Sequence, residues 1–412
     1  MSAAPPRPGL WYLALSSYWF ATAFKWTLVL FVLLPARVAE LVPAGERASK
    51  LGFLFGLGAV MATLGPPVFG YLSDRFSLPG GRRLPYLALG ALLTSAALWG
   101  MAGAPSYPVL VAYYLLLQFS DDLATGPYSA LIPDLVPRER RGVASGWMGS
   151  LQALAQIAAG AAGFLVASLP QLFLLTSAVN LAGAAVTLAF VREPRTAPPR
   201  REGLLESLLL PWRDPDFRWV WGTRFLVMLG QYLVQTYLQY YLADVVRVFS
   251  VFGRVVARQA HQAVGLLVLL ISLGGAVAAV PAGRISDRVG RKLPIYVSGV
   301  ALSLLLVPVL VFPSYQALLV IALLFGLGYG VYAAVDWALA SDVLKRPEAH
   351  ATEMGVWQTS IVIPQILAGS LGRAVDGLNA VAPALGYRAA FVLAAAAFLA
   401  GTLLVSRVRG VR

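Results

Sequence analysis

Apolar runs of about 20 residues recur along the whole chain, separated by short polar segments. A helix that rises 1.5 Å per residue needs about 20 residues to cross roughly 30 Å of hydrocarbon. Of the 412 residues, 58% are hydrophobic and 12% are charged, whereas soluble domains carry roughly 25% charged residues. Helices satisfy their own backbone hydrogen bonds in lipid. The sequence therefore predicts an all-α protein of the membrane.

The runs predict twelve transmembrane helices in two six-helix bundles. In the first bundle, residues 1–191, the spans are expected near 10–33, 49–73, 84–103, 107–133, 143–168 and 171–191. In the second, residues 217–412, they are expected near 217–243, 262–286, 293–312, 314–343, 354–373 and 386–406. The proline-containing and charged segment 192–216 is predicted to link the bundles in the cytoplasm. Segment 244–261 is predicted to be an amphipathic surface helix or, equally, a structured outer loop.

The basic residues fall mostly in one set of alternate connections. The positive-inside rule then places both termini and the linker in the cytoplasm of a multi-pass protein of the cell (inner) membrane. The net charge of +13 lies in short loops between spans, so nucleic acid is not an expected partner. The expected partner is the lipid bilayer.

The residues needed for catalysis or a cofactor are not apparent. The chain has no cysteine and two histidines, His261 and His350, both near helix ends, so no metal constellation is expected. No nucleotide-binding loop and no nucleophile–base pair can be recognised. We therefore predict a protein that is not an enzyme and holds no cofactor, with energy supplied by an ion gradient or by solute exchange.

An internal repeat follows the second and eighth predicted spans. The first copy reads Gly70-Tyr-Leu-Ser-Asp74-Arg75 and then Gly81-Arg82-Arg83-Leu-Pro85, and the second reads Gly283-Arg-Ile-Ser-Asp287-Arg288-Val-Gly290-Arg291-Lys292-Leu-Pro294. A further repeat follows spans four and ten. Parallel repeats of this kind build transporters whose substrate site lies between the halves near the bilayer midplane.

These motifs resemble the major facilitator superfamily, whose signature Gly-x-x-x-Asp-Arg-x-Gly-Arg-Arg/Lys lies between helices two and three and again between eight and nine. The resemblance covers essentially the whole chain and implies the major facilitator fold, alternating access and a monomer. The stretch from Gly126 to Gly146 looks like bacterial members near the sucrose–proton and glycoside–cation symporters. Those glycoside symporters carry acidic sodium-site residues in helix two. Span two here has none, so protons are expected rather than sodium.

The resemblance implies a cytoplasmic gate. A carboxylate can accept charge-assisted bonds from guanidinium groups and from helix N-termini, so Asp74 is expected to engage the basic loop that follows it. The alternative is that the basic residues only hold the loop inside. Asp134 is expected to join Arg138 and Arg141 in a supporting cluster. The candidate gating residues are Gly70, Asp74, Arg75, Arg82, Arg83, Gly283, Asp287, Arg288, Gly290 and Arg291, with Arg224 and Asp336 as either an inner gate or a static pair.

Three ionisable residues lie near mid-depth in the first half: Lys25 in span one, and Asp121 and Asp122 in span four. Ionisable residues inside a membrane are costly and mark functional sites. Adjacent helical residues point about 100° apart, so only one aspartate can face the cavity squarely. We predict that one aspartate carries the proton and that Lys25 is its partner. The alternative is a structural ion pair.

Span seven carries Gln231, Gln235 and Gln239 on one helical face. Amides with aromatic neighbours suit a neutral polyhydroxylated ligand, although glutamines also join membrane helices. The further substrate candidates are Tyr18, Gln118, Trp337, Trp357 and Gln358. The two halves are expected to match in their loop clusters but not in their mid-membrane residues.

The sequence thus predicts a secondary active transporter that moves a small polar solute, a sugar or glycoside, coupled to protons. The alternative is an exporter or facilitator of amphipathic compounds, such as a drug or a lysolipid, for which a large apolar cavity would be expected.

Overall fold

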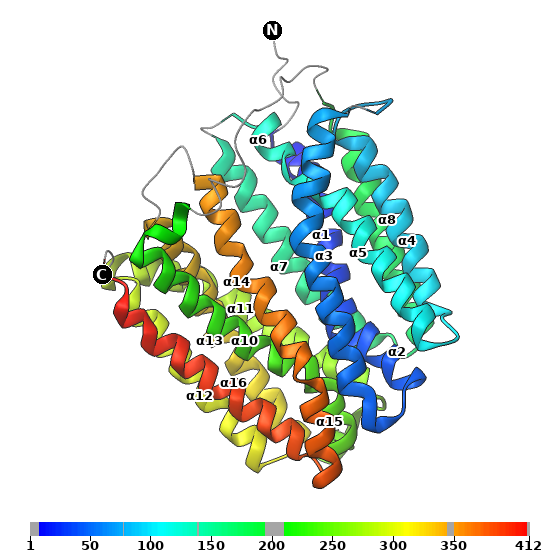
Figure 1. The fold of residues 1–412 in the computed structure, drawn as a ribbon, viewed down its shortest axis with the longest axis vertical. Coiled ribbons are helices and arrows are strands. Elements are labelled where there is room, and N and C mark those ends of the chain that lie inside the picture. The colour runs from blue at the N-terminus through cyan, green and yellow to red at the C-terminus, as the bar shows by residue number, and fades with distance from the viewer. Residues whose placement is uncertain (1–7, 77, 138–139, 194–209, 344–349, 410–412) are drawn as a thin grey trace. The chain divides into compact units, whose positions relative to one another are not determined.

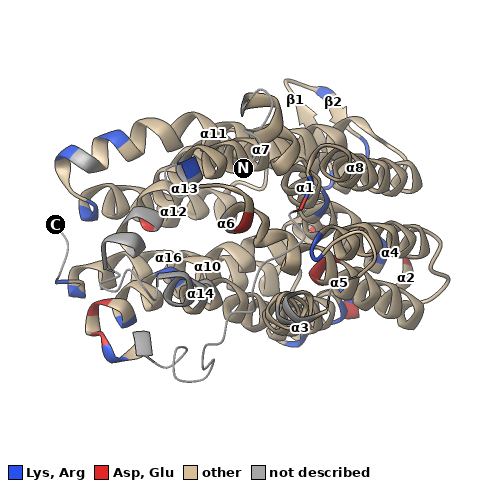
Figure 2. Ribbon diagram, turned by 90° about the horizontal axis from the view of Figure 1, so that it is seen from above, with Lys and Arg blue, Asp and Glu red and all other residues tan. Residues whose placement is uncertain are grey.

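The computed structural model describes residues 8–76, 78–137, 140–193, 210–343 and 350–409. The described chain is almost wholly helical (Figure 1), which confirms the predicted all-α membrane fold. Figure 2 shows how few charged residues the helices carry. The chain divides into two compact units: residues up to 41 and from 60 to 193 form the first, and residues 42–59 and those from 210 onward form the second.

The first unit begins with α1 (Pro8–Leu28), which continues through a π-helical turn at Val29–Leu33 into α2 (Leu34–Leu41). The other helices are α4 (Leu84–Ala102), α5 (Tyr107–Ser129), α6 (Leu131–Leu135), α7 (Arg141–Leu165) and α8 (Leu169–Phe190). A proline in the first turn starts α4, α5 and α8, where its missing N–H costs nothing. The long helix α3 (Arg47–Arg75) contributes its last half to this unit.

The second unit contains α10 (Pro215–Tyr241), α11 (Ala260–Val289), α12 (Lys292–Val311), α13 (Tyr315–Val343), α14 (His350–Ser370), α15 (Gly372–Val381) and α16 (Leu385–Leu404). The first turns of α3 belong here. The Asp376 carboxylate on α15 accepts hydrogen bonds from the Ala48 amide at 3.3 Å and the Ser49 amide at 2.8 Å, so it caps the N-terminus of α3.

Helix pairing repeats between the units. In the first, α1 packs on α7 and α8, and α4 packs on α5 and α8. In the second, α10 packs on α14 and α16, and α12 packs on α13 and α16. Counting the spanning helices of each half from one to six, both units thus pair helix one with five and six, and helix three with four and six. The duplication seen in the sequence is therefore also present in the packing.

Among the residues that the structure describes, ten helices are long and apolar enough to cross a membrane by length and composition. Helices α5 and α10 have 23 and 27 residues, which is also sufficient length. They fall outside the ten because of the polar residues they carry, which include Asp121, Asp122 and Arg224. Both helices thus carry candidate site residues.

Segment 244–261 is not an amphipathic helix. After a π-helical turn at Leu242–Val246, strands β1 (Phe249–Val251) and β2 (Arg254–Ala257) form an antiparallel hairpin. Phe252 and Gly253 between them have φ values of 47° and 79°, the two positive values of a type I′ turn, which matches strand twist. The valines around this turn favour strand over helix. The segment is therefore a structured loop, which was the alternative expectation.

Candidate functional site

A buried ion pair joins α1 and α5 in the first unit. The Lys25 ammonium group donates to Asp121 Oδ1, and the two side chains are 0% and 5% exposed. The indole Nε1 of Trp26 donates to Asp121 Oδ2 at 2.6 Å. Both carboxylate oxygens of Asp121 are therefore occupied, as a buried charge requires.

Asp122 has different surroundings. Its Oδ1 accepts a hydrogen bond from Gln118 Nε2 at 3.2 Å, while its buried Oδ2 has no partner among the described residues. A Cβ atom added at Gly65 of α3 would overlap the Asp122 carboxyl group. Asp122 therefore points at α3, immediately before the two prolines of that helix, Pro66 and Pro67. Asp121 pairs with the lysine and Asp122 lies beside it on a separate face.

Two hydroxyl groups lie on the same face of α1 as Lys25. Tyr18 and Thr22 are buried, and neither hydroxyl has a hydrogen-bond partner among the described residues. The Tyr18 ring meets the Tyr128 ring edge to face, with 5.3 Å between centroids. Unpaired buried hydroxyls are unusual, and here they offer bonding positions next to the ion pair.

The second unit holds its own buried ion pair. Arg224 of α10 donates to Asp336 Oδ2 of α13 at 2.6 Å. The Arg224 guanidinium also lies over the Trp357 ring of α14, 3.5 Å from its centroid. This stacking makes a cation–π contact. The structure thus brings together the two residues that the sequence offers as an inner gate or a static pair.

The two ion pairs occupy equivalent helices. Each joins a cation on the first spanning helix of its half to an aspartate on the fourth. The halves therefore correspond in which helices carry the pair, although the paired residues are not at equivalent positions along those helices. Comparing the repeats by sequence did not reveal this correspondence for that reason.

The glutamine face of α10 is mostly enclosed. Gln235 and Gln239 are each 5% exposed, and Gln231 is half-buried. Trp357 is buried, and its ring stacks against Arg224. The side chains of Trp337 and Gln358 lie outside those that the structure describes.

The loop cluster after α3 centres on Arg83. Its guanidinium group donates to Asp134 Oδ2 at 3.2 Å and to the Ser73 hydroxyl. Arg82 Nε donates to the Ser73 carbonyl at 3.2 Å. Asp134 therefore pairs with Arg83. The side chains of Asp74, Arg75 and Arg141, and all of Arg138, fall outside the described parts.

Glu193, which sequence reasoning missed, is central to this cluster. Its carboxylate accepts the Arg82 amide at 2.6 Å, the Arg83 amide at 2.8 Å and the Leu84 amide. These amides precede and begin α4, so Glu193 caps that helix and compensates its dipole. The one sequence signal for this capping role is an acidic residue shortly after the predicted end of the sixth span.

The second motif copy repeats one contact. Arg291 donates to the Ser286 hydroxyl at 2.7 Å, and Ser286, like Ser73, precedes the motif aspartate. Gly290 ends α11 with φ of 90°, a conformation that favours glycine. Gly70 and Gly283 lie near the ends of α3 and α11, and Arg288 is exposed. The side chain of Asp287 lies outside the described set.

Comparison with known proteins agrees with this architecture. The model of the Major Facilitator Superfamily matches residues 14–253 and 255–412. An uncharacterized MFS-type transporter of Sinorhizobium fredii is 27% identical over 305 residues, which cover 72% of this chain and 71% of that protein. Another, of Mycobacterium tuberculosis, is 26% identical over 268 residues, covering 62% and 56%.

Two solved structures share the fold. The nucleoside transporter NupG aligns with a TM-score of 0.72 at 13% identity, covering 96% of this chain and 98% of that one. A bacterial homologue of the human lysosomal transporter Spinster aligns with a TM-score of 0.67 at 14% identity, covering 98% and 96%. At these identities the likeness concerns the fold alone. From the family match, the chain belongs to the Major Facilitator Superfamily and is a membrane transporter, not an enzyme.

Proposed function

We propose that this transporter couples the movement of a small polar solute, of the sugar or glycoside class, to protons by alternating access. The observation that carries the proposal is the cluster of Lys25, Asp121 and Asp122, where one cation and two carboxyl groups are buried together. Ionisable groups in this position are expensive unless the transport cycle uses them.

The two carboxyl groups have different roles in this proposal. Asp121 is bonded to Lys25 and Trp26, so it holds the lysine in place. Asp122 has an oxygen without a partner, and a buried charge without a partner is costly. A proton on Asp122 removes that cost and leaves the cluster neutral. Asp122 is therefore the proposed proton carrier.

Gln118 connects the proton to the solute. Its amide donates to Asp122 Oδ1, and the Tyr18 and Thr22 hydroxyls lie on α1 with no partner among the described residues. A solute rich in hydroxyl groups can bond to all three, because amides and hydroxyls both donate and accept. Binding that engages Gln118 changes the hydrogen bonding of Asp122, and this links solute occupancy to protonation. Sugars, glycosides and nucleosides, the last being the substrate class named for NupG, share this chemistry.

Transport in proteoliposomes tests the proton role. We expect Asp122→Asn to retain solute exchange but lose accumulation driven by an inward proton gradient. Asp121→Asn and Lys25→Gln should lose both, because each leaves a buried charge without its partner. Glu40→Gln is the matched control, since Glu40 is 52% exposed. Gradient-driven accumulation at wild-type level in the Asp122 variant would overturn the assignment.

A stabilisation screen tests the solute class. A ligand at about 100 times its Kd stabilises the folded state by about 2.7 kcal/mol, which is measurable as a higher Tm. We expect stabilisation by members of a panel of sugars, glycosides and nucleosides, reduced in Gln118→Ala. Stabilisation by amphipathic drugs and lysolipids alone would replace the proposal with transport of amphipathic compounds.

A further inference from the structure

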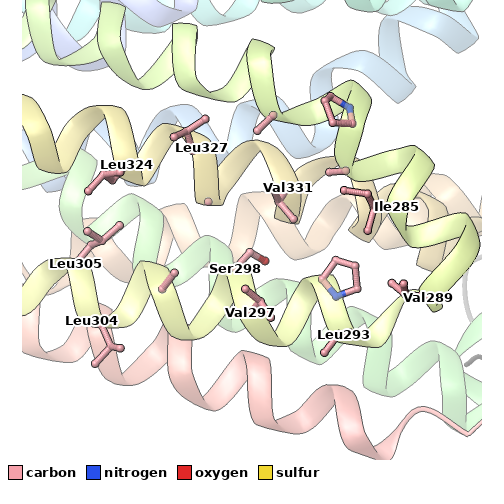
Figure 3. A pocket seen from close by; sticks show the side chains of 16 residues that line it. Ile285, Val289, Leu293, Val297, Ser298, Leu304, Leu305, Leu324, Leu327 and Val331 are labelled. Carbon is pink, nitrogen blue, oxygen red and sulfur yellow. The ribbon is translucent and has the colours of Figure 1, made fainter.

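An open apolar groove runs along the second unit between α11 and α12, with α13 as its floor (Figure 3). Its volume is about 790 Å³. Alanine, valine, leucine and isoleucine dominate the lining, and Ser298 is the one hydroxyl residue among the lining residues. A groove of this kind is unsuited to the polar solute proposed above and matches an apolar ligand.

The groove results from unequal helix packing. α12 packs along α13 and α16 but touches α11 only slightly, whereas α11 and α13 are in intimate contact. Their crossing is close because Gly274 and Gly326 face the partner backbone, where an added Cβ would overlap main-chain atoms. The groove begins at Ala278, one turn after this crossing. α11, closely packed on α13, thus forms one wall of the groove, and α12 forms the other.

The groove has the length of one membrane leaflet. Its lining extends from Ala278 to Val289 on α11 and from Leu293 to Leu305 on α12, or about 17 Å at 1.5 Å per residue. Half of a hydrocarbon core of roughly 30 Å is about 15 Å. The lining side chains Val297 and Leu304 are 64% and 62% exposed, so the groove is open along its length. An acyl chain fits both its length and its chemistry.

One end of the groove is strongly basic. Four basic residues and one acidic residue, Asp287, occupy the short stretch where α11 ends and α12 begins; the basic ones are Arg284, Arg288, Arg291 and Lys292. Arg284 and Arg288 are exposed. Arg288 comes three residues after the lining residue Ile285 and seven after Pro281, which places it on the groove face of α11. The apolar lining therefore leads directly to cationic side chains.

We propose that this groove is a binding site for an anionic phospholipid, with one acyl chain along α11 and α12 and the phosphate beside Arg284 and Arg288. The apolar lining selects a lipid over a free anion, and the net positive end selects an anionic headgroup over a zwitterionic one. The lipid bridges two helices that otherwise barely touch, and it does so beside the second copy of the signature motif. Its binding therefore stabilises the α11–α12 corner. The proposal does not depend on the identity of the solute.

The test measures binding of phosphatidylglycerol to the purified full chain by native mass spectrometry and by the rise in Tm in detergent. Arg284→Gln combined with Arg288→Gln should weaken binding about thirtyfold, from the loss of two surface charges. Ala301→Trp should abolish the rise in Tm by filling the groove, since Ala301 lines it. The first matched control is Arg254→Gln with Arg258→Gln, which removes one exposed arginine of β2 and one directly after it. The second is Val300→Trp, which lies on α12 outside the lining. Both controls should bind like the wild type.

Four results would overturn the proposal. Phosphatidylcholine could stabilise the protein as well as phosphatidylglycerol, which removes the headgroup selection. Inorganic phosphate alone could give the full effect, which indicates a site for a free anion. Ala301→Trp could bind phosphatidylglycerol normally while the arginine variant does not, which indicates that the lipid binds to surface charge and not in the groove. A control variant could lose binding as strongly as its test variant, which removes the assignment to this place.

Discussion

At the scale of single residues, two neighbouring aspartates have different surroundings. Asp121 and Asp122 follow each other on α5, yet one has two partners and the other has a free oxygen among the described residues. The sequence identified both, because ionisable residues within apolar spans stand out. It did not distinguish them, because the difference depends on where α1 and α3 lie, with Lys25 on one side and Gly65 on the other.

The contribution of the Lys25–Asp121 pair to stability can be measured separately from its role in transport. Lys25→Met leaves Asp121 buried without its cation and should cost about 3–5 kcal/mol. The double variant Lys25→Met with Asp121→Leu should recover most of this loss, because two apolar residues can replace a buried pair, yet it should not transport. Thermal unfolding in detergent and uptake assays measure the two effects. Full uptake by the double variant would show that the pair is only structural.

At the scale of elements, helix ends determine how the loop clusters are built. Three consecutive amides at the start of α4 donate to Glu193, a residue that follows α8. The sequence indicated that α4 begins near residue 84 but gave no partner for its N-terminus, because the partner comes from a distant segment. The hairpin is a different case, because its turn at Phe252 and Gly253 is local. The surrounding Val and Phe residues alone fit either a helix or a strand.

Removing the cap of α4 should have a moderate and local effect. Glu193→Ala should reduce the free energy of unfolding by about 1–2 kcal/mol, the usual cost of losing an N-terminal cap. Glu40→Ala is the control, because the Glu40 side chain is 52% exposed in a surface pair with Arg37. Denaturation in mixed micelles compares the two variants. Equal, negligible losses would show that the contacts of Glu193 do not hold the helix end.

At the scale of the whole molecule, the duplication is visible in helix pairing as well as in sequence. The apolar runs predicted the number and order of spans because each run of about 20 residues forms one spanning helix. It did not predict that residues 42–59 cluster with the second unit, since α3 is one continuous helix and nothing in its sequence marks the change of neighbours. The Arg224–Asp336 pair likewise required the packed structure to be seen as the counterpart of Lys25–Asp121.

The predicted orientation can be tested directly because the chain contains no cysteine. Single cysteines at Gly45 and Ser406, both exposed, can each be labelled without removing others. A membrane-impermeant maleimide should label Gly45→Cys in intact cells and should label Ser406→Cys only after the cells are permeabilised, because the positive-inside rule places the C-terminus inside. The opposite pattern would reverse the orientation.

The buried ion pairs also bear on how the protein is made. In each half the cation is synthesised first, and its carboxylate follows 96 residues later for Lys25 and 112 residues later for Arg224. At about 5–20 residues per second, each cation waits roughly 5–20 s for its partner. A lone cation at the centre of a helix costs about 3 kcal/mol in membrane insertion. A ribosome that stalls between Lys25 and Asp121 therefore leaves an uncompensated charge in the first helix, which weakens the insertion of that helix by this amount.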